Sequence, residues 1–122
     1  MKRLIKLDSI FGMADLNPQK AGLSVTIWSE HGGILRNVSH SNTPRVKIGY
    51  QGGPSVSVTI SENPEIKVRS NHIKKSEMKA IEEGIAYVSR NYDIFLKHFM
   101  DTKYEFDDDD MKDALRKRGE YK

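Results

Sequence analysis

The stretch from Arg45 to Ile60, "RVKIGYQGGPSVSVTI", decides the fold of this chain. Branched apolar residues stand at every second position on both sides of "QGGP", and this period of two is typical of strands with one buried face. The two glycines supply the backbone freedom that a tight connection needs, so the stretch predicts a β-hairpin. The side chains expected on its buried face are Val46, Ile48, Val56, Val58 and Ile60.

The segments on either side extend the hairpin into a sheet. "LSVTIWSE" (23–30) alternates in the same way and places Trp28 on the outer face. "EIKVR" (65–69) follows the turn "SENP", and its alternation predicts Ile66 and Val68 on the inner face with the charged residues outside. The result is an antiparallel meander of four or five strands, with one dry face and one wet face.

Outside these strands the pattern is weaker. "RLIKLDSI" (3–10) and a short run at 34–38 have a strand-like composition. "NPQKAG" (17–22) is predicted to be a turn or loop, because Pro18 and Gly22 punctuate it.

Helical periodicity replaces the alternation after residue 69. Ser70 or Asn71 is expected to cap a first helix, Asn91 to end it, and Asp93 to begin a second, shorter helix. Apolar residues three or four positions apart give each helix one apolar face, which is expected to cover the dry face of the sheet. These residues are Met78, Ile81, Ile85, Val88, Ile94, Phe95, Phe99 and Met100.

A charged C-terminal segment, residues 101–122, is predicted to be a helix or tail that follows a single α+β domain formed by residues 1–100. Its acids come first and its bases last. That order suits a helix of about ten residues that starts in the run Asp107–Asp110, because acids stabilise the positive end of the helix dipole and bases the negative end. The predicted fold is α+β, with the antiparallel meander packed on two C-terminal helices.

The composition limits the classes of protein to consider. The chain has 122 residues, which suits one domain, and 37% apolar against 30% charged residues, which suits a thin core and a solvated surface. The absence of cysteine excludes disulfides, thiolate nucleophiles and thiolate zinc sites. No apolar run is long enough for a signal peptide or a membrane span, so a soluble cytoplasmic protein without a membrane partner is expected.

The predicted wet face of the sheet collects positive charge. Residues 36–75 contain seven Lys or Arg and two acids, a local charge of +5. Cations and hydroxyls contact phosphates, and an aromatic ring stacks on a base. An ordinary solvated face and a surface for an acidic protein stay open as alternatives. The predicted nucleic-acid-binding residues are Trp28, Arg45, Lys47, Ser57, Thr59, Lys67 and Arg69.

The pieces "HSNTPRVKIGY", "SVSVTI", "ENPEI" and "NYDIFLKHF" follow one another in the chain. In this order they resemble a family of short, uncharacterised bacterial proteins whose strand motif reads roughly H-x-P-P-H-F-H-V, and the similarity spans residues 23–100. The two strand histidines of the family fall on Arg45 and Lys47, so any metal or acid–base role that they serve is expected to be absent here. The resemblance implies a toxin–antitoxin-like or defence neighbourhood.

The four histidines have no metal-ligand spacing, so no metal and no cofactor are expected. His31 is predicted to be a loop residue, and His98, on the second helix with Phe95 and Phe99, a residue at the boundary between core and surface. His40 or His72, beside basic residues, is compatible with a metal-free ribonuclease in which histidine acts as the base and cations stabilise a phosphorane-like state.

The leading prediction is a non-catalytic accessory or regulatory module of bacterial defence. It binds nucleic acid, or a nucleic-acid-bound effector complex such as an RNA-guided nuclease. The alternatives are the metal-free ribonuclease toxin of a toxin–antitoxin pair and a protein-binding adaptor or inhibitor that acts through the C-terminal segment. A homodimer is compatible with the strand edges. The predicted partner-binding residues are Tyr104, Phe106, Arg116 and Arg118.

Overall fold

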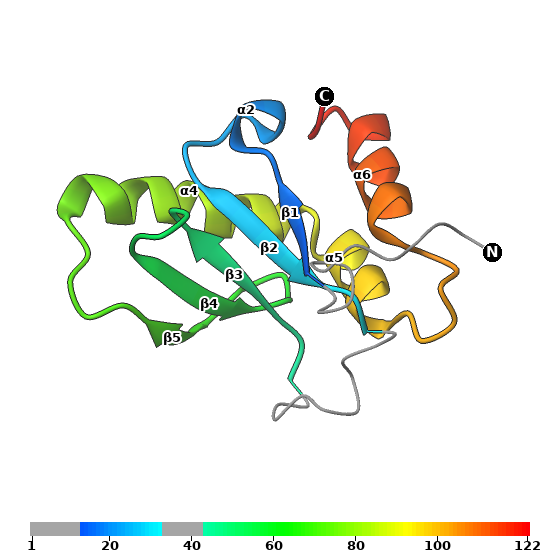
Figure 1. Cartoon of the computed structure of the whole chain (residues 1–122), viewed down its shortest axis with the longest axis horizontal. Coiled ribbons are helices and arrows are strands. Elements are labelled where there is room, and N and C mark those ends of the chain that lie inside the picture. Colours follow the sequence, from blue (N-terminus) through cyan, green and yellow to red (C-terminus); the bar gives the residue numbers. More distant parts are fainter. Residues whose placement is uncertain (1–12, 33–42) are drawn as a thin grey trace.

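A computed structural model describes residues 13–32 and 43–122. Five strands form one antiparallel sheet in the order β1–β2–β3–β4–β5, so each strand pairs with its neighbour in sequence (Figure 1). The predicted α+β meander is confirmed, whereas the strands suggested at 3–10 and 34–38 lie outside the described residues. The strands are β1 (Met13–Leu16), β2 (Thr26–Glu30), β3 (Arg45–Gly49), β4 (Ser55–Thr59) and β5 (Ile66–Arg69). The helices are α2 (Pro18–Ala21), α4 (Lys75–Arg90), α5 (Tyr92–Met100) and α6 (Asp108–Lys117).

The core lies between the sheet and two helices. α4 packs on β3 and β4, and α5 packs on β2. Both helices lie behind the sheet in Figure 1, and no described helix crosses its front face. Ile27, Ile48 and Val56 stand side by side in the register and are almost fully buried. Burial of each such side chain stabilises the fold by about 1.5–3 kcal/mol.

α4 begins at Lys75, later than either predicted cap. The Ser70 hydroxyl is used elsewhere, because it accepts from the backbone N–H of Ser55 and donates to the Ser55 carbonyl. Glu77 caps the helix instead, and its Oε1 accepts from the Lys74 backbone N–H at 2.9 Å. The predicted helix start is therefore wrong, because the side chain of the expected cap residue Ser70 is bonded to the backbone of β4.

The segment 17–22, predicted as a turn or loop, forms the single helical turn α2. The Asn17 side chain accepts from the Lys20 backbone N–H at 3.1 Å, and Gly22 ends the turn with a φ of 72°. The Asn17 backbone N–H donates to the Tyr121 hydroxyl at 3.2 Å. This turn therefore contacts the C-terminal end of the chain.

β5 departs from the predicted alternation. Ser57 pairs with Val68 while Val58 pairs with Ile66, so the register shifts between these two pairs. Lys67 is therefore an extra residue in β5 that has no opposite residue in β4. Val68 consequently lies on the outer face and is 56% exposed, and Ile66 is 38% exposed. The predicted inner position of Val68 is therefore wrong, whereas Ile66 lies opposite the buried Val58 on the inner face, as predicted. Ile66 is still partly exposed, because β5 is an edge strand and the main helix contacts fall on β2, β3 and β4.

α6 is part of the core. Met111 and Leu115 are fully buried in the same cluster as the sheet residues, and Tyr121 is nearly so. The predicted ten-residue helix that starts in the Asp run is confirmed: the Asp107 side chain accepts from the Asp110 backbone N–H at 2.9 Å. The C-terminal segment therefore packs against α5 and closes one end of the domain.

Candidate nucleic-acid interface

One row of side chains crosses the outer face of all five strands. Residues opposite each other in antiparallel strands share a face. The register places in this row Asp15, Trp28, Lys47, Ser57 and Val68. The Lys47 ammonium lies 4.9 Å from the centre of the Trp28 ring. Such a cation–π contact contributes about 0.5–1 kcal/mol at an exposed site.

Arg45 adds a second cation to the same face of β3. It lies opposite Thr59 in the register, and its buried Nε has no hydrogen-bond partner in the part of the chain that the structure describes. Neither Arg45 nor Lys47 forms an ion pair with another described residue. Thr59, by contrast, is engaged, because its hydroxyl accepts from the Glu65 backbone N–H at 2.9 Å.

The other two predicted cations do not join this group. Lys67 pairs with Glu65, at 3.2 Å between Nζ and Oε1. Arg69 lies opposite the buried Val56, so the extra residue in β5 moves it to the helix side of the sheet and its predicted outer position is wrong. The predicted residues that do share the outer face, here named the outer-face group, are Trp28, Arg45, Lys47, Ser57 and Thr59.

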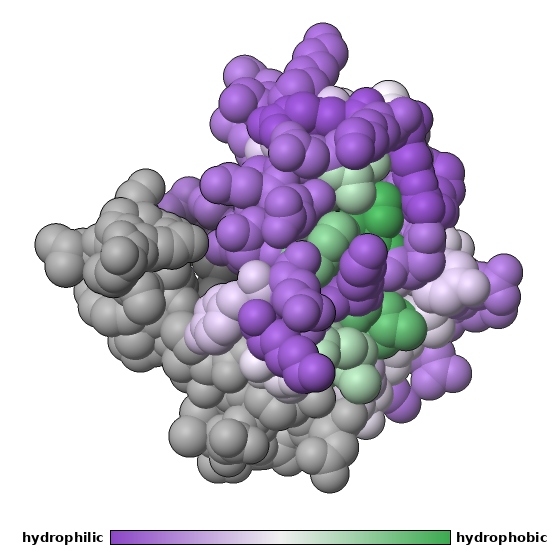
Figure 2. All heavy atoms as spheres, turned by 90° about the vertical axis from the view of Figure 1, so that its right-hand side faces the viewer, coloured by the Kyte–Doolittle hydropathy of each residue, from purple (hydrophilic) through white to green (hydrophobic). Residues whose placement is uncertain are grey.

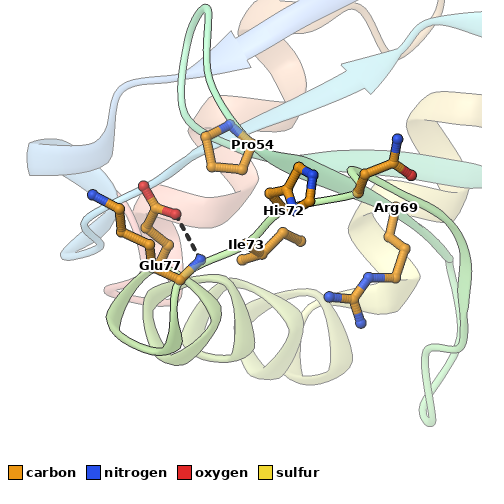
Figure 3. A pocket seen from close by; sticks show the side chains of 7 residues that line it. Pro54, Arg69, His72, Ile73 and Glu77 are labelled. Atoms are coloured by element: carbon orange, nitrogen blue, oxygen red, sulfur yellow. Dashed lines mark hydrogen bonds between the residues drawn. The ribbon is translucent and has the colours of Figure 1, made fainter.

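Arg69 instead lines an open hollow of about 440 Å³ between the hairpin and the start of α4. Figure 3 shows Arg69 and Glu77 at opposite sides of this hollow, with His72 between them. Glu77 is held by the Lys74 backbone, and the three side chains do not converge on one point. Acid–base catalysis needs such convergence. The hollow therefore gives no support to His72 as a ribonuclease base, and His40 lies outside the described residues.

The structure contains a cluster that sequence reasoning missed. The rings of His31 and His98 lie 5.1 Å apart between centres. His31 Nε2 is 2.7 Å from Asp101 Oδ2, and His98 Nε2 is 2.7 Å from Asp108 Oδ1. His98 Nδ1 is 2.8 Å from the Ser29 hydroxyl. We name these five residues the histidine cluster. His98 is fully buried, so its predicted boundary position is wrong.

The histidine cluster fastens the C-terminal segment to the sheet. Ser29 and His98 are fully buried, so the serine hydroxyl is not accessible to a substrate. The two carboxylates follow α5 and open α6, and their pairs with the histidines hold the α5–α6 connection in place. No spacing rule detects this arrangement, because Ser29 and His98 are 69 residues apart and the His31–Asp101 pair spans 70.

Hydrogen bonds within the cluster lower the pKa of both carboxyl groups. Burial alone raises the pKa of Asp101, but its bonds with His31 and with three backbone N–H groups prevail and lower the pKa from 3.8 to about 2. Burial also raises the pKa of Asp108, and the contact with His98 prevails there, so the net shift is downward. Both aspartates are therefore ionised at neutral pH.

The lowered pKa of Asp101 predicts that the folded protein loses stability in acid. Because the folded pKa lies below the ordinary value of 3.8, the carboxylate stabilises the fold fully above about pH 4, and this contribution is lost as the pH falls towards 2. We expect the free energy of unfolding of the wild type to fall more steeply across this window than that of Asp101→Asn. Urea denaturation at several pH values measures both, and equal slopes would contradict the assignment.

Asp108→Asn is expected to destabilise the protein by about 1 kcal/mol, because it keeps the shape of the side chain but removes the charge from its bond with the buried His98. Asp109→Asn is the matched control, since Asp109 is exposed in the same helical turn, and it is expected to change stability by less than about 0.5 kcal/mol. Thermal unfolding compares the two variants. Equal stabilities of the two variants would show that the bond between Asp108 and His98 contributes nothing to the stability of the fold.

Most predicted anchors of the C-terminal segment have partners within the chain. Arg116 and Arg118 form ion pairs with nearby aspartates, and Phe106 packs against the core. Tyr104 is 53% exposed and stacks on His31, with 4.9 Å between ring centres. Figure 2 shows the side of the molecule that carries α6, where a narrow strip of apolar atoms lies between hydrophilic side chains.

Among residues 13–32 and 43–122, no three acidic or histidine side chains gather as a metal site. None of the helices in these ranges combines the length and the apolar composition of a membrane span. No family model, curated protein or solved structure matches the chain. The resemblance of the strand motif therefore stays a prediction.

Proposed function

We propose that this chain is a non-catalytic module that binds nucleic acid through the outer face of its sheet. The nucleic acid is either free or held in a nucleoprotein effector complex such as an RNA-guided nuclease. The observation that carries the proposal is the outer-face group. Arg45 and Lys47 project from one strand beside the Trp28 ring, and neither cation has an ion-pair partner among the described residues.

The charge of this face supports an anionic ligand. Two cations at alternate positions of one strand repel each other when no counter-charge lies between them. A phosphate backbone offsets this repulsion and gains affinity by releasing its own counter-ions. Ser57, which lies beside Lys47 in the register, adds a hydroxyl of the kind that contacts phosphate and sugar oxygens.

The biological setting is also a proposal. The resemblance of the strand motif to a family with toxin–antitoxin-like neighbours supports a role in bacterial defence, in the cytoplasm. Arg45 and Lys47 stand where that family has histidines, and this exchange favours binding by charge over acid–base or metal chemistry.

A second candidate function is the capture of a protein by the α5–α6 connection. Tyr104 is exposed and has a φ of 57°, a strained conformation for a bulky residue, and such strain is frequent at functional sites. Deletion of residues 101–122 cannot test this function, because it removes Met111 and Leu115 from the core. Loss of partner capture by Tyr104→Ser, with unchanged thermal unfolding, would favour it.

The test of nucleic-acid binding is a titration of labelled single- and double-stranded RNA and DNA with the full chain across a salt series. We expect affinity that falls steadily with increasing salt, because each phosphate contact releases counter-ions. Light scattering on the same samples shows whether one or two copies bind. No binding to any of the four probes at low salt would overturn the proposal and favour a protein partner.

A further inference from the structure

We propose that the outer face selects single-stranded nucleic acid, by stacking one unpaired base on the Trp28 ring in the place that the Lys47 ammonium occupies. This inference rests on the proposed function and specifies its ligand. The Lys47 ammonium covers the ring at 4.9 Å from its centre. A base that takes this place moves the ammonium aside, where it is free to contact the phosphate of the same nucleotide.

The exchange is favourable because Lys47 is held loosely. It is exposed and has no ion pair with another described residue, so the cation–π contact is the interaction that the base must replace. Base–aromatic stacking is stronger than a cation–π contact at an exposed site. Trp28 itself is half-buried between β1 and β3, so its ring is positioned before the ligand arrives.

The surface of the sheet next to the Trp28 ring is low, because several side chains there are short. The outward positions towards the hairpin carry short hydroxyl side chains, namely Thr26, Ser55 and Ser57, so no bulky side chain of the described residues stands there between a flat base and the sheet. Thr59 and the longer side chains of Glu30 and Arg45 lie on the other side of the ring. A duplex keeps the faces of its bases stacked inside the helix and cannot offer one to an aromatic ring. The outer face therefore distinguishes a single strand from a duplex by whether the flat side of a base is accessible, and it does not contact the hydrogen-bonding edge of the base.

The charged residues around Trp28 also orient the bound nucleic-acid strand. Asp15 lies beside Trp28 on β1, and the cations Arg45 and Lys47 lie on its other side on β3. A phosphate is repelled at Asp15 and attracted at β3, so the backbone of the ligand is expected to run over β3 and β4 with its base directed back towards β2. Asp15→Asn is accordingly expected to raise the affinity about threefold.

Trp28 is the only tryptophan of the chain, so its fluorescence reports directly on this site. The full chain is titrated with a 12-nucleotide oligo(dT), with the same sequence as a duplex, and with inorganic polyphosphate of similar charge. We expect strong quenching by the single strand, about tenfold weaker binding of the duplex, and binding of polyphosphate without stacking-type quenching. Comparable affinity for the duplex, or single-strand binding that leaves the fluorescence unchanged, would overturn the inference while the proposed function stands.

Three variants separate stacking from charge, with binding followed by the anisotropy of a labelled oligo(dT). Trp28→Leu is expected to weaken binding about tenfold and to leave the salt dependence unchanged, whereas Trp28→Phe retains most of the affinity. Lys47→Met is expected to flatten the salt dependence by about one unit. Trp28→Leu that binds like the wild type would overturn the inference. If no nucleic acid binds the wild type at all, the proposed function fails first and the inference fails with it.

Discussion

Changing Arg45 and Lys47 together to glutamate is expected to lower the affinity for nucleic acid by about 100-fold or more at low salt. Each reversal removes one phosphate contact and adds a charge that repels the backbone, and a tenfold loss per position corresponds to about 1.4 kcal/mol. The slope of log affinity against log salt should flatten by about two units, one for each cation that no longer neutralises a phosphate.

The fold of this double variant is expected to stay intact. Lys47 is exposed, Arg45 is half-buried, and neither has an ion-pair partner in the described residues whose loss would destabilise the sheet. Removal of Arg45 also removes a buried Nε without a hydrogen bond. Circular dichroism and thermal unfolding should therefore match the wild type, so that weaker binding reports on the surface.

The matched control reverses two charges elsewhere. Lys75→Glu with Lys79→Glu makes the same change in net charge on exposed positions of α4, which lies on the helix side of the sheet. Both double variants are therefore also compared at physiological salt, where screening limits the effect of such distant charges and the control is expected to lose less than about threefold. If the control loses as much affinity as the outer-face variant, binding follows net charge and the proposed interface is wrong.

Gly49→Ala is expected to destabilise the protein by about 3 kcal/mol or more. A Cβ atom at this position would lie 2.4 Å from the Pro54 carbonyl oxygen and 2.5 Å from the Ser55 Cα. Both are backbone atoms, one at the end of the hairpin connection and one at the start of β4, and neither can rotate away, so β3 and β4 must separate at the hairpin. Because these two strands form the centre of the sheet, the whole domain is expected to lose stability.

Gly52→Ala is the control for this prediction. Gly52 lies in the same hairpin, has a φ of 73° and has open space where a Cβ would lie. Gly52→Ala is therefore expected to lower the free energy of unfolding only by the strain of an alanine in the left-handed conformation, about 1–2 kcal/mol. Urea denaturation of the two variants separates a steric clash from backbone strain. If Gly49→Ala is no less stable than Gly52→Ala, small movements of the backbone relieve the clash and the prediction is wrong.

The hairpin was predictable because its period of two is local. This period predicts Val46 and Val58 on the inner face, and the structure places them opposite each other and fully or almost fully buried. The same holds for Ile81 and Phe95, whose helical spacing indicates their burial without knowledge of the sheet. The outer position of Lys47 follows from the same alternation, so the sequence alone predicts this part of the candidate interface.

β5 shows where a local pattern fails. Its alternation is as regular as that of β4, yet the extra residue Lys67 changes the faces of Val68 and Arg69. Two features protect this edge from pairing with other chains, namely the irregular register and the charged residues. The charged residues are visible in the sequence, whereas the irregular register is not a property of the segment alone, because it depends on how β5 meets β4.

The sequence by itself determined which faces of the central strands and helices are apolar, and from this the α+β meander and the cations on its outer face. Only the tertiary structure decided the register of β5, the close approach at Gly49 and the histidine cluster that holds the C-terminal segment. The physical reason is the range of the interactions. Periodic burial repeats within a few residues, whereas a clash with a paired backbone or a hydrogen bond between Ser29 and His98 exists only after distant segments have been brought together.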